Sequence, residues 1–215
     1  MGALSSLIND YHIGVYDYSN LKEGFNSISN FEFEMIRTPG HKEDAVSYYF
    51  KDDNCMFVGD FIFRNSIGRT DLEGGNYSDM KKSIEKFQAE AVERAKERLI
   101  SQAKDICGIN TITAVMPMRP DMAKDLAFKI KAALPNHMLC VLGTHFEDRP
   151  TLTVMLSDDL VADGSLNAGA LVRQVARHIK GGGGGQPHFA TAGGKDINGL
   201  SIAVEEILDT VKNKM

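Results

Sequence analysis

The sequence of 215 residues has few cysteines, no long apolar run and no secretory signal. Its three cysteines, Cys55, Cys107 and Cys140, are far apart and show no CxxC spacing, which is typical of reduced structural thiols. Cys55 and Cys140 stand in apolar runs, so we expect both to be buried. No apolar run approaches the roughly 18 residues that span a bilayer. These absences predict a soluble, cytoplasmic chain with no membrane partner.

The chain also lacks the usual phosphate-binding motifs. A Walker loop ends in Gly-Lys-Ser/Thr, and a dinucleotide fingerprint places a spaced GxGxxG directly after a strand. Neither spacing occurs in the sequence. A classical nucleotide cradle is therefore excluded.

Glycine, by contrast, is concentrated near the carboxyl end. Seven of the fourteen positions from 181 to 194 are glycine, five of them consecutive at Gly181–Gly185. Glycine loses more conformational entropy on ordering than any other residue. A segment with this many glycines is therefore an unfavourable way to build an ordinary connecting loop. The sequence therefore predicts a glycine-rich loop, whose bare backbone amides suit the close approach of an anion. A flexible linker is the alternative, but only about twenty residues follow, and they have the pattern of one helix.

A basic helix is predicted immediately before the glycines. Over residues 167–180, apolar residues recur on one side, and Arg173, Arg177 and Lys180 follow one another at helical spacing on another. Such a charged face is often only solvated. Three cations leading to bare amides nevertheless favour a polyanion such as an RNA backbone.

These residues carry a resemblance to a known family. Lys180, the five glycines, Gln-Pro-His-Phe-Ala and then Thr-Ala-Gly-Gly-Lys-Asp are similar to the signature of the DHH-associated, C-terminal domain of alanyl-tRNA synthetases, and the likeness covers residues 85–215. The resemblance implies a non-catalytic module that helps to hold tRNA specific for alanine and supports homo-dimerisation. On this basis we assign RNA contact to Arg173, Arg177, Lys180, Gly181, Gly182, Gly183, Gly184, Gly185, His188, Gly193, Gly194 and Lys195.

The hydrophobic pattern agrees with a compact α/β unit. Apolar residues three or four apart predict a long amphipathic helix over 78–106, which Gly108 is placed to end. The elements expected after it are a strand over 109–116, a helix over 120–134, hairpin strands over 138–145 and 151–157, the basic helix, and a last helix over 198–212.

The first eighty residues resemble a different family. Thr38-Pro39-Gly40-His41, then a strand-like run, then Cys55 to Asp60, are similar to the later metal-binding half of metallo-β-lactamase-fold hydrolases of the glyoxalase II group. The resemblance implies that His41 binds zinc and that Asp60 bridges two metals. In that family a metal-bound hydroxide attacks an ester or thioester, because the metal lowers the pKa of water and polarises the carbonyl.

The departure from that family is as informative as the match. The first ligand cluster, HxHxDH, is missing, and so is the last ligand histidine. A catalytic zinc usually has three protein ligands plus water, and His41 with Asp60 supplies two. His12 could add a third, although its surroundings favour a structural role. We therefore assign no catalytic residue, expect no required cofactor, and keep zinc at His41 and Asp60 as an open possibility.

The sequence thus predicts a composite of mixed α/β (α+β) class. Residues 1–84 form a partial metallo-β-lactamase-like β-rich segment and residues 85–215 a compact DHH-associated α/β domain, with the seam inside the long helix. Charge separates the parts: lysine plus arginine against aspartate plus glutamate is 8 against 13 in the first and 16 against 16 in the second. Because an acidic segment binds polyanions poorly, RNA contact is expected in the second part.

Three functions remain open from the sequence. The first is a non-catalytic, tRNA-binding and oligomerisation module, which we favour because its family motif is whole. The second is a zinc-dependent hydrolase of esters or thioesters with an incomplete metal site. The third is a structural dimerisation module, in which the long helix mediates self-association and the glycines form only a tight packing turn. No enzymatic activity is expected of the chain on its own.

Overall fold

The computed structural model describes residues 15–53, 55–64 and 66–214 and divides the chain into two compact units between Phe87 and Gln88. His12 lies outside the described residues. The predicted seam, between residues 84 and 85, and the observed division both lie within one helix, α2 (Tyr77–Ser101). Where the two sequence families join stays a prediction.

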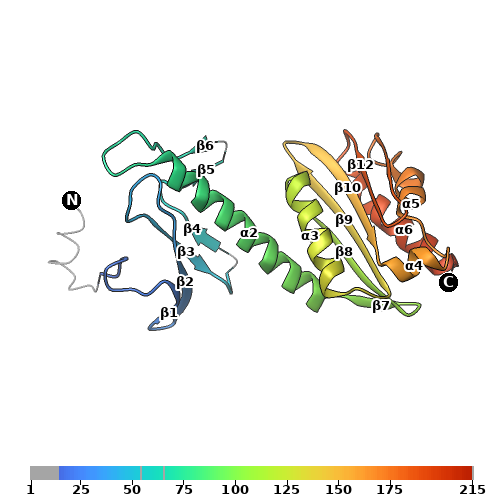
Figure 1. Cartoon of the computed structure of the whole chain (residues 1–215), viewed down its shortest axis with the longest axis horizontal. Coiled ribbons are helices and arrows are strands. Elements are labelled where there is room, and N and C mark those ends of the chain that lie inside the picture. Colours follow the sequence, from blue (N-terminus) through green and yellow to red (C-terminus); the bar gives the residue numbers. More distant parts are fainter. Residues whose placement is uncertain (1–14, 54, 65, 215) are drawn as a thin grey trace. The chain divides into compact units, whose positions relative to one another are not determined.

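The first unit is built on a four-stranded antiparallel sheet in the order β1-β2-β3-β4 (Figure 1). Its strands, with a separate two-stranded pair, are β1 (Gly24–Ile28), β2 (Phe31–Arg37), β3 (Val46–Phe50), β4 (Cys55–Phe57), β5 (Ile62–Phe63) and β6 (Ser66–Ile67). In β2 the apolar side chains of Phe33 and Met35 are buried and alternate with glutamates, as a half-buried strand requires. The ring of Phe61 meets that of Phe87 edge-on, which packs α2 against this unit.

The second unit is a six-stranded mixed sheet in the order β11-β12-β10-β9-β8-β7. Its elements are β7 (Lys104–Ile106), β8 (Ile109–Pro117), α3 (Pro120–Ala133), β9 (Met138–Phe146), β10 (Arg149–Leu156), α4 (Asp158–Ala162), α5 (Ala168–Val175), β11 (Gly182–Gly185), β12 (Phe189–Gly193) and α6 (Gly199–Lys214). Only β8 and β9 pair in parallel, because α3 carries the chain from one to the other. The predicted hairpin of β9 and β10 is confirmed.

Helices cover this sheet on both faces (Figure 1). On one face α3 and the second half of α2 bury a core that includes Leu99, Leu126 and Ile130. On the other face α5 and α6 bury a larger core that includes Val172 and Ile207. The mixed α/β class predicted from the pattern is therefore confirmed.

The long helix ends earlier than its periodicity predicts. It stops at Ser101 rather than Ile106, and Lys104–Ile106 instead forms the strand β7 against β8. The two strands are joined by Cys107 and Gly108, which have φ values of 54° and 81°. Two consecutive residues with positive φ make the tight turn that matches strand twist, so Gly108 belongs to a hairpin and not to a helix end.

The three cysteines differ in exposure. Cys140 is fully buried, and burial raises the pKa of its thiol to about 12, whereas Cys55 and Cys107 are exposed. The prediction that Cys55 is buried was wrong, because β4 lies at the edge of its sheet.

We expect an excess of a maleimide at neutral pH to modify Cys55 and Cys107 in the folded protein and to modify Cys140 only in denaturant. Only thiolates react quickly, and burial keeps Cys140 protonated and inaccessible. Mass spectrometry of the labelled peptides measures this. Rapid labelling of Cys140 without denaturant would contradict the buried position of β9.

Within residues 15–53, 55–64 and 66–214, no helix is long and apolar enough to cross a membrane.

Candidate nucleic-acid interface

The consecutive glycines form a strand rather than the predicted loop. Gly182–Gly185 make up β11, which pairs antiparallel with β12 and is the edge strand of the six-stranded sheet. The predicted basic helix is also shorter than expected. It begins at Ala168, capped by the side chain of Asn167, and ends at Val175, and residues 176–180 are turns.

The helix end explains why the chain can turn so sharply into β11. The amide of Gly181 donates to the carbonyl of Ala176, and Lys180 has a φ of 49°. This is the geometry that commonly closes a helix, with a left-handed residue after the last turn. Arg173 therefore lies on α5, whereas Arg177 and Lys180 lie in the turns that follow it.

Three of the five glycines are required by packing. A Cβ atom on Gly181, Gly183 or Gly185 would lie 1.9, 2.3 or 2.4 Å from a backbone oxygen of the adjacent β12 region. No side chain fits at those distances, so the close contact between the two backbones explains why these three residues are glycine. To this extent the tight-packing interpretation of the glycines is supported.

The alternate glycines have no such requirement. A Cβ on Gly182 would meet nothing within 4 Å, and one on Gly184 would meet only an Arg173 guanidinium nitrogen at 3.8 Å. Neither residue has a positive φ that would exclude other side chains. The bare backbone at these two positions is thus not explained by the fold itself, and a cation lies beside one of them.

Gly193 and Gly194 lie at the end of β12 and continue this surface. Gly193 pairs with Gly182 and has open space around its Cβ position, whereas a Cβ on Gly194 would lie 2.1 Å from the carbonyl oxygen of Ile179. Lys195 follows, is exposed, and forms no ion pair with a described residue. His188 lies at the opposite end, in the turn between β11 and β12.

The other two predicted RNA-binding cations are already paired within the protein. Lys180 Nζ lies 2.8 Å from Asp196 Oδ2, and Arg177 Nη2 lies 2.9 Å from Glu206 Oε2. Arg173, by contrast, is exposed and forms no ion pair with a described residue. The structure therefore brings Arg173 to the glycine strand and turns Arg177 and Lys180 toward carboxylates.

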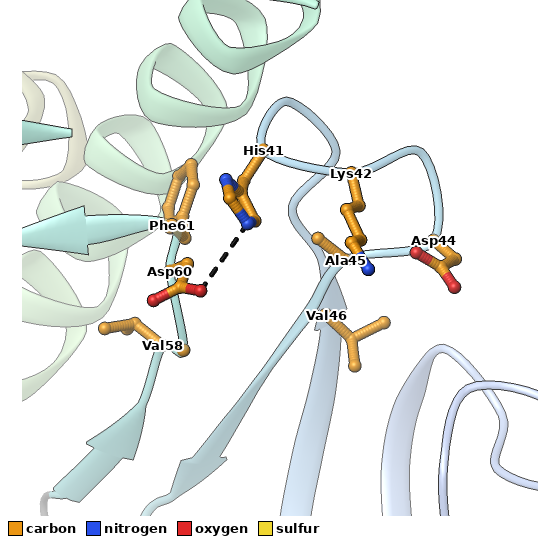
Figure 2. Close-up of a pocket in the computed structure, with 9 residues that line it drawn as sticks. His41, Lys42, Asp44, Ala45, Val46, Val58, Asp60 and Phe61 are labelled. Atoms are coloured by element: carbon orange, nitrogen blue, oxygen red, sulfur yellow. Dashed lines mark ion pairs between the residues drawn. The ribbon is translucent and has the colours of Figure 1, made fainter. Parts of the chain in front are cut away.

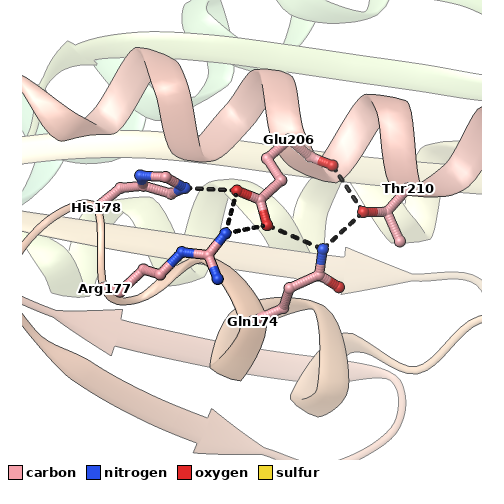
Figure 3. A network of polar contacts seen from close by, with 5 residues as sticks. All are labelled: Gln174, Arg177, His178, Glu206 and Thr210. Atoms are coloured by element: carbon pink, nitrogen blue, oxygen red, sulfur yellow. Dashed lines mark hydrogen bonds and ion pairs between the residues drawn. The ribbon is translucent and has the colours of Figure 1, made fainter.

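Glu206 is the centre of a small polar network between the α5 region and α6 (Figure 3). Its carboxylate accepts hydrogen bonds from Gln174 and Arg177, and His178 Nε2 lies 2.5 Å from its Oε2. These contacts, with the one to His178 largest, lower the pKa of Glu206 below its usual value. The hydrogen bond and charge of Lys180 similarly lower the pKa of Asp196, while Asp196 raises that of Lys180.

The first unit places His41 and Asp60 together, as the resemblance implies (Figure 2). His41 Nε2 lies 3.5 Å from Asp60 Oδ2 at a cavity of about 330 Å³ that Lys42 and Phe61 also line. His41 Nδ1 lies 2.8 Å from the carbonyl oxygen of Arg69, which can only accept, so Nδ1 carries the proton. Nε2 is therefore the ring nitrogen that faces Asp60, and an Nδ1–H held by a backbone carbonyl is also the usual arrangement of a metal-ligating histidine.

The donor set is nevertheless too small for a catalytic metal. In the described part of the chain, no group of three or more His, Cys, Asp or Glu side chains could hold a metal ion. The residues present fit only part of the site that the hydrolase family implies, since a catalytic zinc takes three protein ligands. We assign no reaction step to this pair.

The domain that contains the glycine strand matches a known family. Residues 108–215 match the family model described as the DHHA1 domain. The chain belongs to the DHHA1 domain family. Its first part is similar to another family, because residues 9–101 match the model of the metallo-beta-lactamase superfamily. The predicted composite of two families is thus confirmed.

Individual proteins are similar to one part of the chain or the other. The alanine–tRNA ligase of Bacteroides fragilis is 46% identical over 130 residues, which are 60% of this chain and 15% of the relative. The C-Ala domain from Aquifex aeolicus alanyl-tRNA synthetase is 20% identical, with a TM-score of 0.47, over 51% of this chain and 97% of that chain. The BLEG-1 B3 metallo-beta-lactamase is 42% identical over 30% of this chain and 31% of that chain, with a TM-score of 0.29. The chain spans about 15% of the length of the ligases that it matches.

The DHHA1 domain contains two residues of this surface that sequence reasoning missed. Glu206 and Asp196 determine where Arg177 and Lys180 point, although Glu206 is 29 positions from Arg177. Asp196 ends the signature Thr-Ala-Gly-Gly-Lys-Asp, but the signature indicates no partner for it, and no local pattern marks Glu206. The pairing of Glu206 depends on how α6 packs beside the turns after α5, whereas Asp196 is held near Lys180 by the bond from its own amide to the Ile179 carbonyl.

Proposed function

We propose that residues 85–215 form a non-catalytic RNA-binding and oligomerisation module that contacts the backbone of tRNA specific for alanine. The observation that carries this proposal is the bare, open backbone at Gly182 and Gly184 with the guanidinium of Arg173 beside it, which forms no ion pair with a described residue. Backbone amides and a nearby cation are the groups that bind phosphate oxygens in protein–nucleic-acid contacts. The similarity to alanine–tRNA ligases supports tRNA as the RNA.

The proposed contact surface follows the β11–β12 hairpin. It contains Gly181–Gly185, Gly193 and Gly194 along the two strands, with Arg173 beside the middle and Lys195 at one end. His188 would add a hydrogen-bond donor at the turn. Arg177 and Lys180 would add positive charge only when they leave their carboxylate partners. The surface provides binding and positioning groups only, so we expect no aminoacylation by this chain alone.

The proposal is tested by titrating the purified chain into labelled tRNA specific for alanine, at salt concentrations between about 50 and 200 mM. We expect affinity to fall with salt, with a slope of log K against log salt between about −2 and −4, because two to four phosphate contacts release counterions. A tRNA for another amino acid is the competitor. No binding at the lowest salt, or a flat salt dependence, would refute the proposal.

Oligomerisation and metal content can be measured on the same preparation. We propose a cytoplasmic homo-dimer, which sedimentation would detect as twice the chain mass of 23.6 kDa. We also expect much less than one zinc ion per chain, because His41 and Asp60 provide only two ligands. Stoichiometric zinc without RNA binding would instead favour the alternative function, a metallo-β-lactamase-fold hydrolase. A dimer without RNA binding would favour a structural module.

A further inference from the structure

The cations that precede the glycine strand are not equally available to a ligand. Arg173 lies beside Gly184 and forms no ion pair with a described residue, whereas Arg177 and Lys180 each lie against a carboxylate from the following part of the chain. All three side chains are exposed. The difference among them is thus one of pairing and not of burial.

The two carboxylates are held more firmly than the cations that they pair with. The side chain of Glu206 is 25% exposed against 67% for Arg177, and that of Asp196 is 24% exposed against 73% for Lys180. Glu206 also bonds Gln174 and His178 (Figure 3). Its helix packs on the sheet through Ala203 and Ile207. A phosphate that approaches Arg177 therefore meets a fixed negative charge.

Asp196 also lies close to the start of the glycine strand. Asp196 follows Lys195, and the amides of both residues donate to the carbonyl of Ile179, two residues before Gly181. Exposed ion pairs are weak and are screened by salt, so Arg177 and Lys180 can leave them. When either cation leaves its ion pair, however, its carboxylate partner remains beside the bound anion. The repulsion between these two negative charges opposes binding.

We propose that Glu206 and Asp196 are built-in counter-ions that screen Arg177 and Lys180 and so limit the affinity of this surface for polyanions of any sequence. This inference rests on the proposed RNA-binding function. Specific binding commonly depends on repulsive as well as attractive groups. RNA with the correct backbone geometry gains binding energy from contacts with Arg173, Lys195 and the glycine strand. Other polyanions are repelled by the two carboxylates and lack those favourable contacts.

Glu206→Gln tests the screening with little change of shape, because the amide can still accept a hydrogen bond from Arg177. We expect this variant to bind RNA of unrelated sequence about five- to tenfold more tightly at about 0.1 M salt, since one freed cation adds about one phosphate contact. The salt slope should steepen by about one unit. Asp196→Asn frees Lys180 and should change binding in the same direction.

Glu205→Gln is the matched control, because Glu205 is the exposed neighbour on the same helix and its loss changes net charge equally. We expect it to change the slope much less than Glu206→Gln. Equal changes in the two variants would show a general charge effect and overturn the inference. Weaker or unchanged RNA binding by folded Glu206→Gln and Asp196→Asn would overturn it as well.

Elution from immobilised heparin separates failure of this inference from failure of the RNA-binding function. The screening predicts that Glu206→Gln and Asp196→Asn elute at higher salt than the wild type and Glu205→Gln, whether or not tRNA is the ligand. If the wild type binds tRNA but these elution positions are unchanged, only the screening is wrong. If elution shifts as expected but the wild type binds no tRNA, only the proposed function is wrong.

Discussion

Replacing Gly183 by alanine is expected to destabilise the second unit by about 3 kcal/mol, whereas Gly182→Ala should change its stability by less than about 1 kcal/mol. The added methyl at residue 183 would lie 2.3 Å from the carbonyl oxygen of Thr191 and 2.5 Å from the Cβ of Ala192. At residue 182 the same methyl meets nothing within 4 Å. The two variants therefore differ only in whether the neighbouring strand must move.

Stability of this unit alone can be measured by denaturant-dependent hydrogen exchange at amides of the central strands β9 and β10. Separate units need not unfold together, so an optical signal from the whole chain is less direct. Gly182→Ala serves as the matched control because it lies one position away on the same strand. Equal stabilities for the two variants would mean that β11 does not lie against β12 as the structure has it.

Loss of the two unpaired cations is expected to have the largest effect on RNA binding. The double variant Arg173→Ala, Lys195→Ala should bind tRNA about 50-fold more weakly at about 0.1 M salt and flatten the salt slope by about two units. Neither side chain forms an ion pair with a described residue, so both charges are available to phosphates. The titration used for the wild type measures this directly.

Two further double variants serve as controls, because they test whether the loss depends on position or only on net charge. Arg98→Ala with Lys104→Ala removes the same charge from exposed positions on α2 and β7, at the opposite edge of the sheet from β11, and should have little effect. Arg177→Ala with Lys180→Ala should cause a smaller loss than Arg173→Ala with Lys195→Ala, because carboxylates already neutralise those cations. An equal loss from all three double variants would indicate that net charge, and not the β11–β12 surface, determines binding.

Most secondary structure of the second unit could be predicted from the sequence. The strands over 109–116, 138–145 and 151–157 and the helix that begins at Pro120 lie within a few residues of β8, β9, β10 and α3. These elements have strong local causes: apolar alternation or helical spacing, and a proline in the first helical turn. The division into two sequence families could also be predicted, because each part contains its own motif.

The predictions of secondary structure that were wrong concern segments whose local sequence fits more than one structure. Apolar spacing continues beyond Ser101, so the sequence alone cannot show that residues 104–106 leave the helix and pair with β8. Glycine likewise occurs in helix ends, linkers and close strand contacts. The pairing of Gly182–Gly185 with β12 decides among them, and that pairing involves residues brought together by folding.

The sequence by itself therefore determined the family, the α/β class and the presence of a glycine-rich, cation-flanked region. Only the tertiary structure decided that alternate glycines face different surroundings and that two of the three cations meet carboxylates. The physical reason is that periodicity and glycine content are local properties of the chain. Steric fit and charge pairing depend on distances between residues such as Arg177 and Glu206, which only the packing of α6 beside the α5 region brings within 2.9 Å.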